Sequence, residues 1–92
     1  MVIKSKERFI YINQNAVCGY KANEEINSFM KSGCKFTIYL EGKYNSYFIE
    51  QAFSNLNYSK EELFDKIEII TGNDLLDEII FNIMNNNKVK TR

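Results

Sequence analysis

Residues 35–56, KFTIYLEGKYNSYFIEQAFSNL, change their hydrophobic periodicity halfway along the stretch. In the first part, Phe36, Ile38 and Leu40 recur at the two-residue period of a strand. After Gly42 the apolar residues recur at the spacing of an amphipathic helix, namely at Phe48, Ile49, Ala52, Phe53 and Leu56. The stretch therefore predicts a buried strand, a tight turn over residues 42–46 and a helix that starts with free backbone amides.

Further elements are predicted on both sides of this unit. The aromatic and branched residues 8–12 indicate a strand, which could begin as early as Val2. Over residues 17–30 a helical stripe is formed by Val17, Tyr20, Ile26, Phe29 and Met30, and Ser32-Gly33 ends it; Gly19 would instead let the helix begin at about Tyr20. Ser59 and Glu62 have the spacing of a capping box at the start of a short helix. The run from Ile67 to Ile70 predicts an inner strand.

A final helix should be capped by Asn73 or Asp74 and should fray at the asparagine run of residues 85–87. Its apolar side would carry Leu75, Leu76, Ile79, Ile80, Ile83 and Met84. Strands and helices thus alternate along the chain, which predicts an α/β fold with a mostly parallel sheet, helices flanking it and right-handed crossovers. The expected domain is the whole of residues 1–92, with a core over about 8–84 and a polar tail over 85–92.

Composition narrows the classes of function. The chain has 92 residues, enough for one core, and its twelve basic and twelve acidic side chains give a formal net charge of zero. We therefore expect no steering toward nucleic acid or an anionic membrane, and a homodimer would not be surprising. No apolar run is long enough to span a bilayer, so the expected location is the cytoplasm.

Catalytic and metal-binding side chains are scarce. The chain has no histidine, which removes the commonest general base and zinc ligand, so we expect no enzyme activity, no catalytic residues, no metal and no cofactor. Cys18 and Cys34 are the only cysteines and are expected to be reduced and mostly buried, with Cys34 in the core. Glu41 and Glu50 are best explained as surface charges.

The order of these elements resembles the STAS-like domains, relatives of the sulfate-transporter and anti-sigma-factor-antagonist domain. The resemblance covers about Gly19 to Met84 and includes a strand that ends in an acidic residue and glycine, Glu41-Gly42. It also includes the Ser59 to Leu63 connector and a serine before a Phe-hydrophobic-x-x-Ala-Phe pattern, with Ser46, Phe48, Ile49, Ala52 and Phe53. Where the family tends to have a run of serine or threonine, this chain has Asn45-Ser46-Tyr47.

The resemblance implies a regulatory role. In anti-sigma-factor antagonists, a serine or threonine at this helix start is phosphorylated by a GHKL-type kinase, and the modification controls docking onto that kinase. By resemblance Ser46 is the candidate phosphoacceptor, although an ordinary helix cap contributing about 1 kcal/mol is the favoured interpretation of this residue. A phosphate at Ser46 would be stabilised by the helix N-terminus and could disrupt a partner surface.

Two main hypotheses of function follow, with a third behind them. The first is a regulatory or adaptor domain that binds a protein through Tyr44, Asn45, Ser46, Tyr47 and Gln51; the resemblance implies a GHKL-type ATPase or kinase, or an associated regulator, as the partner. The second is a small phage- or plasmid-borne inhibitor that blocks a larger host complex through acidic residues such as Glu61, Glu62, Asp65, Asp74, Asp77 and Glu78. The third is a binder of nucleotides or other small ligands at the edge of the sheet.

Overall fold

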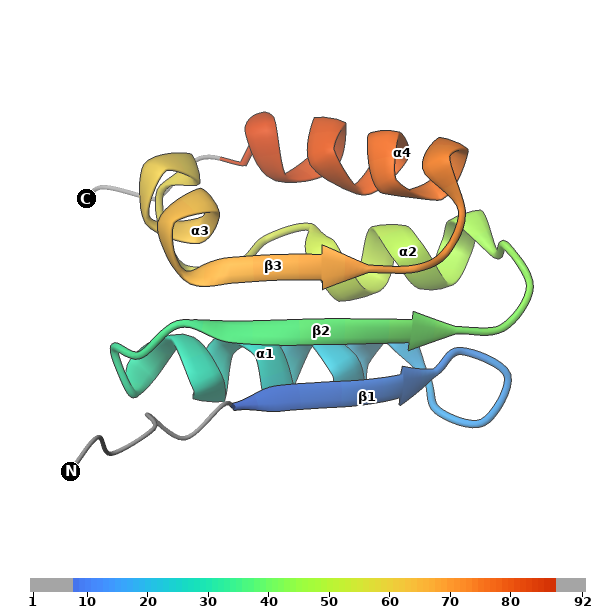
Figure 1. The fold of residues 1–92 in the computed structure, drawn as a ribbon, viewed down its shortest axis with the longest axis horizontal. Coiled ribbons are helices and arrows are strands. Elements are labelled where there is room, and N and C mark those ends of the chain that lie inside the picture. Colours follow the sequence, from blue (N-terminus) through green and yellow to red (C-terminus); the bar gives the residue numbers. More distant parts are fainter. Residues whose placement is uncertain (1–7, 88–92) are drawn as a thin grey trace, which may run out of the picture.

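The computed structural model describes residues 8–87 and contains three strands and four helices in this range (Figure 1). Their order along the chain is β1 (Phe9–Asn13), α1 (Gly19–Lys31), β2 (Phe36–Glu41), α2 (Ser46–Phe53), α3 (Lys60–Lys66), β3 (Ile67–Ile70) and α4 (Asp74–Asn85). The predicted alternation of strands and helices is confirmed. The strand that could begin at Val2 begins at Phe9 within the described residues, and residues 1–7 lie outside them.

The three strands form one parallel sheet in the order β1-β2-β3. Ile10 is in register with Ile38, and Ile38 is in register with Ile69. In Figure 1 the strands run from left to right while α1 and α2 pass behind them, so both crossovers are right-handed. The small α/β fold with a parallel sheet is thus as predicted, but β3 is an edge strand, and the inner strand is β2.

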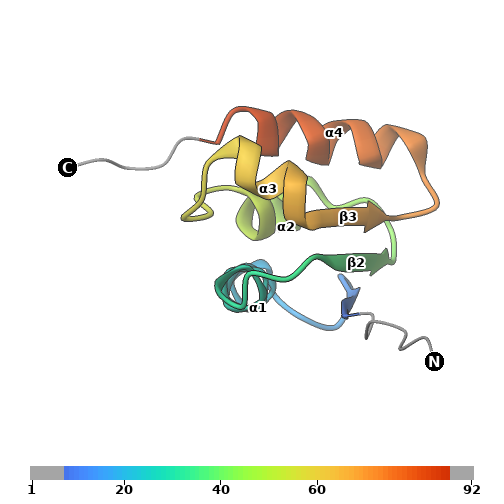
Figure 2. The same ribbon diagram turned by 60° about the vertical axis from the view of Figure 1, so that its left-hand side comes forward.

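The helices form a layer on one side of the sheet. α1 packs against α2, and α2 packs against α4. Figure 2 shows the same arrangement from a turned view, with α1 next to β2 and α4 beyond β3. One face of the sheet is therefore covered by helices, while the other meets none of the described ones.

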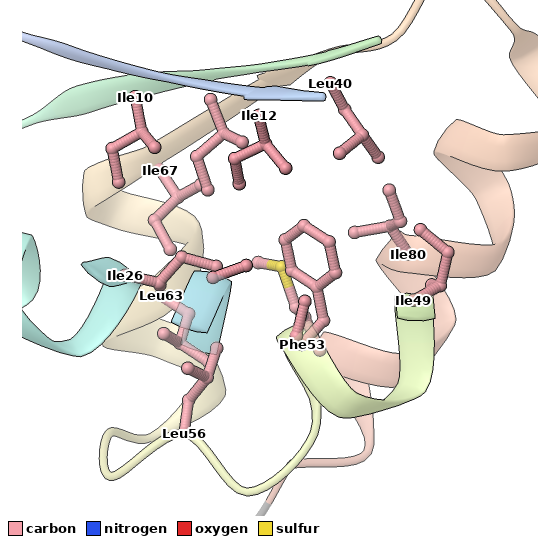
Figure 3. Packing of buried hydrophobic residues seen from close by; sticks show 14 of the residues in the cluster. Ile10, Ile12, Ile26, Leu40, Ile49, Phe53, Leu56, Leu63, Ile67 and Ile80 are labelled. Atoms are coloured by element: carbon pink, nitrogen blue, oxygen red, sulfur yellow. The ribbon is translucent and has the colours of Figure 1, made fainter. Parts of the chain in front are cut away.

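The core lies between the sheet and this layer (Figure 3). Ile10 and Ile12 of β1 and Leu40 of β2 point toward Phe53 of α2 and Ile80 of α4. These side chains are almost fully buried, and burial of each large aliphatic or aromatic side chain stabilises the fold by about 1.5–3 kcal/mol. The strand positions that alternate with them, such as Tyr11 and Tyr39, face away from the helices.

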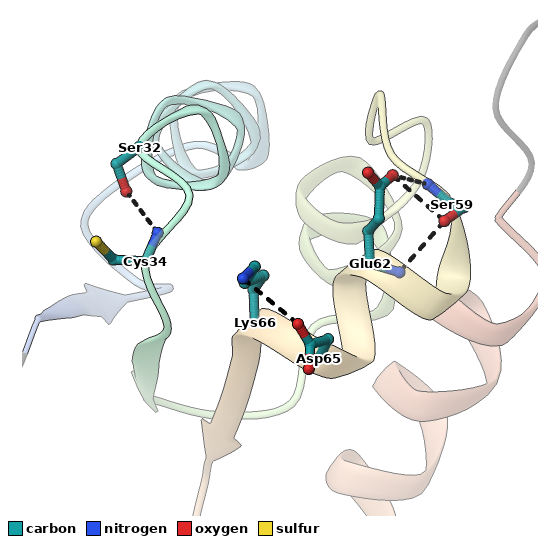
Figure 4. Close-up of polar contacts among 6 residues, drawn as sticks. All are labelled: Ser32, Cys34, Ser59, Glu62, Asp65 and Lys66. Carbon is teal, nitrogen blue, oxygen red and sulfur yellow. Dashed lines mark hydrogen bonds and ion pairs between the residues drawn. The ribbon is translucent and has the colours of Figure 1, made fainter.

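Short polar side chains set where the helices begin. The Ser59 hydroxyl accepts from the Glu62 amide at 3.2 Å, and the Glu62 carboxylate accepts from the Ser59 amide at 3.0 Å, which confirms the predicted capping box (Figure 4). Asn73 caps α4, because its side-chain oxygen accepts from the Leu76 amide at 3.1 Å. α1 has no side-chain cap at Cys18.

Asparagine side chains hold the segment between α2 and α3, which has no regular structure. Asn23 of α1 donates to the carbonyl oxygens of Ala52 and Ser54, at 3.0 and 2.9 Å. The Asn87 amide donates to the carbonyls of Leu56 and Tyr58 and accepts from the Leu56 amide. Asn85 is the last residue of α4 and Asn87 is bonded, whereas residues 88–92 of the expected tail lie outside the described range.

Some predicted core positions are exposed instead. Leu75 of α4 and Val17 and Tyr20 at the start of α1 face the solvent, although their spacing matched the apolar stripes. In α1 the buried stripe is made by Gly19, Ala22, Ile26 and Met30. The shift arises because α1 begins at Gly19 rather than Val17 and its smallest residues face α2 and the sheet.

Candidate functional site

The turn between β2 and α2 is fully open to solvent. Every residue from Glu41 to Tyr47 is exposed, at the edge of the sheet where all three parallel strands end. Gly42 has a φ of 118°, a conformation that favours glycine, and a Cβ at this position would lie 2.8 Å from Cγ of Gln14. The sequence thus predicted the turn correctly, and Gly42 is required for its backbone.

Asn45, rather than Ser46, caps α2. The Asn45 side-chain oxygen accepts a hydrogen bond from the Phe48 amide at 3.1 Å, and Asn45 has extended backbone angles. Ser46 is the first helical residue and is exposed. The interpretation of Ser46 as an ordinary helix cap is therefore wrong, because the residue before it already satisfies the free amide.

A shallow groove runs between α1 and α2 next to this turn. Its walls include Tyr20 and Asn23 from α1 and Tyr47 and Gln51 from α2, with Glu50, Ser54 and Asn55 completing the lining. Tyr20 is 67% exposed and Tyr47 is 70% exposed, so both rings are available to another molecule. Of the predicted contact residues, the structure brings Tyr47 and Gln51 together in this groove, while Tyr44 and Asn45 stay on the exposed turn.

The groove has its shape because the two helices approach closely at Gly19. A Cβ at Gly19 would collide with Cβ of Gln51 and would lie 2.9 Å from the carbonyl oxygen of Phe48. This close approach also leaves the first turn of α1 beside α2. Glycine at position 19 is thus explained by helix packing.

One buried polar side chain close to the turn, that of Gln14, was not predicted from the sequence. Gln14, just after β1, is only 4% exposed, and neither its amide nitrogen nor its side-chain oxygen has a hydrogen-bond partner among the described residues. Its position continues the inward alternation of Ile10 and Ile12, and this alternation is the signal that could have predicted its burial. A buried amide without partners costs stability.

Both cysteines are free and exposed. The prediction that the thiols are mostly buried is therefore wrong, and Cys34, predicted in the core, lies in the loop before β2 (Figure 4). There its backbone amide donates to the Ser32 hydroxyl at 3.3 Å. Within residues 8–87, no group of three or more histidine, cysteine or carboxylate side chains is placed to hold a metal ion.

The acidic side chains of α3 and α4 fall into three groups. Glu62 belongs to the capping box, and Asp77 accepts from the Thr71 hydroxyl at 2.8 Å, so both have structural roles. Asp65 lies 3.4 Å from the ammonium group of Lys66 (Figure 4). Glu61, Asp74 and Glu78 are exposed and free for contact with a partner.

The fold and the surface define a small parallel α/β domain with a tyrosine-lined groove beside an open strand-to-helix turn. No protein-family model matches the chain, and no curated protein or solved structure shows significant similarity to it. Among the described helices, none combines the length and the apolar character needed to cross a bilayer.

Proposed function

We propose that this domain is a non-enzymatic regulatory or adaptor module that binds another protein through the β2–α2 turn and the α1–α2 groove. The supporting observation is the convergence of two highly exposed tyrosines, Tyr20 and Tyr47, on a groove that also presents the polar side chains of Asn23 and Gln51. Tyrosine is enriched at protein interfaces because its ring supplies apolar area and its hydroxyl supplies a hydrogen bond.

The resemblance to STAS-like domains makes a GHKL-type ATPase or kinase, or a regulator associated with one, the proposed class of partner. Ser46 is the proposed site of control. Support comes from the finding that Asn45 performs the capping, which leaves the exposed Ser46 hydroxyl in the first turn of α2 without that role. A phosphate there would add about −1.5 to −2 charges immediately beside Tyr47, and the helix N-terminus would stabilise it.

A reducing compartment such as the cytoplasm suits this proposal. Cys18 and Cys34 are both exposed free thiols, and such thiols persist where glutathione and thioredoxin keep them reduced.

The test is quantitative co-purification from the native host, with bound proteins and phosphorylated residues identified by mass spectrometry. Tyr20→Ala and Tyr47→Ala should each reduce recovery of the partner about tenfold, since exposed tyrosines often act as hot spots. Tyr11→Ala is the matched control, because Tyr11 is similarly exposed but lies on the open face of the sheet. Equal recovery with all three variants would refute the groove as the docking site.

Ser46 is tested in the same assay. Ser46→Glu should reduce recovery of the partner, while Ser46→Ala should preserve it, because only the first substitution introduces charge beside the groove. A phosphopeptide containing residue 46 should appear in the purified protein. Identical recovery with both variants, together with the absence of that phosphopeptide, would remove the proposed control while leaving the docking site intact.

The second candidate is the phage- or plasmid-borne inhibitor that acts through its acidic surface, and it is favoured by the exposure of Glu61 on α3 and Glu78 on α4. Glu61→Lys combined with Glu78→Lys tests this surface without touching the structural carboxylates of Glu62 and Asp77. Loss of the partner with this double variant, and retention with Tyr47→Ala, would favour the inhibitor over the adaptor.

A further inference from the structure

The face of the sheet opposite the helices presents an aromatic surface. Figure 1 looks directly onto this face, and no described element crosses in front of the strands. Phe9 is 54% exposed and Tyr11 is 62% exposed. The rings of Phe9 and Tyr39 meet edge to face, with centroids 5.6 Å apart. The outward-facing residues include Phe9, Tyr11, Thr37, Tyr39, Glu68 and Ile70.

An uncovered face of this kind is unusual for a parallel sheet. Purely parallel sheets are almost always covered on both faces, and contiguous apolar surface on a monomer commonly marks an interaction site. The stacked pair of Phe64 and Phe81, at 4.9 Å, lies on α3 and α4 and already covers part of its own surface. The sheet face, in contrast, is not covered by any of the described residues, so we expect another group to pack against it.

Opposite charges lie at the two ends of this face. Lys35 directly precedes β2, and Glu41 is the last residue of β2. Side chains alternate along a strand, so both residues share the outward side with Thr37 and Tyr39. Lys35 and Glu41 are also exposed. Along β2 the face therefore has a positive end and a negative end with uncharged residues between them, while Glu68 of the neighbouring strand β3, in register with Thr37, places one carboxylate toward the Lys35 end.

We propose that a second copy of this chain covers the face in a symmetric dimer, with the strands of the two sheets running in opposite directions. A two-fold axis perpendicular to the strands and passing near Ile38 would place Lys35 of each copy opposite Glu41 of the other. A two-fold axis along the strands would instead oppose like charges, which is unfavourable. The charge pattern thus selects one of the two symmetric arrangements.

The same axis also suits the aromatic residues. β1 of one copy would lie against β1 of the other, so that Phe9 faces Tyr11 and Tyr11 faces Phe9. Offset and edge-to-face contacts between such rings are favourable. Glu68 lies on the edge strand β3, and its carboxylate oxygen is 3.5 Å from the Thr37 hydroxyl. The Glu68 carboxylate can therefore remain hydrated at the solvent-exposed rim of the interface.

The size of the face implies a weak dimer. Three partly exposed aromatic rings and Ile70 provide roughly 400–500 Å² per copy, below the roughly 800 Å² per partner of a standard interface. We therefore expect association only at high protein concentration, as for other interfaces below the standard size. Single-stranded nucleic acid could also stack on such rings, but Glu41 and Glu68 would repel its phosphates.

Sedimentation equilibrium over about 5 µM to about 1 mM tests the proposal. The mean mass of the full chain should rise from the 10.8 kDa of the monomer toward twice that value. Tyr11→Lys should weaken association at least about tenfold, because it puts a charge at the centre of the aromatic contact. Tyr47→Lys is the matched control: the same substitution at an exposed tyrosine away from the sheet face, which should leave association unchanged.

Charge variants test the arrangement of the two copies. Lys35→Glu should weaken self-association because both ends of the face become acidic, and Glu41→Lys should weaken it because both become basic. Mixing the two variants should restore association at least to the wild-type level, since each copy then opposes unlike charges at both ends. Urea denaturation of each variant verifies that all of them fold.

Three results would overturn the proposal. They are a wild-type mass that stays monomeric at 1 mM, association that Tyr11→Lys leaves unchanged, and a mixture of the charge variants that associates no better than either variant alone. Binding of oligothymidine, detected by quenching of tyrosine fluorescence in a protein that does not self-associate, would assign the face to nucleic acid instead.

Discussion

Gly19 and Gln51 are in direct contact where α1 packs against α2, so closely that a Cβ on Gly19 would collide with the Gln51 Cβ. This contact sets the distance between the two helices that carry Tyr20 and Tyr47, and it therefore sets the width of the groove between them.

Gly19→Ala should destabilise the protein, although alanine usually favours a helix over glycine. The added methyl would overlap Gln51 and lie 2.9 Å from the Phe48 carbonyl oxygen, and overpacking of this kind costs about 1–3 kcal/mol. Urea denaturation measures the effect. Lys21→Ala, at an exposed position of the same helix, is the control and should change stability by less than about 0.5 kcal/mol. A Gly19→Ala variant as stable as the wild type would contradict the close approach.

Asn45→Ala should lower the free energy of unfolding by about 1 kcal/mol, because the Phe48 amide loses its side-chain acceptor. Ser46→Ala should have an effect below about 0.5 kcal/mol, since Ser46 is exposed and does not cap the helix. The two urea midpoints, measured side by side, decide which residue is the cap. The reverse order of effects would return that role to Ser46.

Gln14→Met should stabilise the protein by about 1–2 kcal/mol. Methionine fills a similar volume and removes a buried amide that has no hydrogen-bond partner among residues 8–87. Thermal unfolding gives the change in stability, with Asn15→Ala as the exposed neighbouring control. A lower melting temperature for Gln14→Met would mean that the amide has a partner, such as an ordered water.

Asn87→Ala should cost about 2–3 kcal/mol, because the substitution removes three hydrogen bonds to the segment between α2 and α3. Asn82→Ala, on the exposed side of α4, should cost less than about 0.5 kcal/mol. Chemical denaturation of both variants gives the comparison. If the two variants were equally stable, the hydrogen bonds of Asn87 would contribute no more to the free energy of unfolding than an exposed side chain of α4.

The order of the elements was predictable because periodicity and caps are local signals. The alternation of Phe36, Ile38 and Leu40 and the Ser59–Glu62 capping box both act within a few residues, and the structure confirms them. The inward alternation of Ile10 and Ile12 also continues to Gln14, which is buried. The burial of Gln14 was not predicted, because an amide side chain is not typical of a buried position.

Features set by tertiary contacts were not predictable in this way. The edge position of β3 depends on the order of strands in the sheet, which no single stretch of sequence encodes. The burial of Gly19 and the exposure of Leu75 depend on which helix lies alongside. Of the candidate site, the turn and Tyr47 followed from the sequence, whereas Tyr20 joined the groove only through the packing of α1 on α2.

The strand order also has a kinetic consequence. β2 pairs with both β1 and β3, so the two βαβ units share it, and neither unit can form before β2 is in place. We expect β2 to belong to the folding nucleus, so that Ile38→Val slows refolding while Ile12→Val and Ile69→Val mainly speed unfolding. Stopped-flow chevron plots of these variants would show whether the transition state is centred on the shared strand.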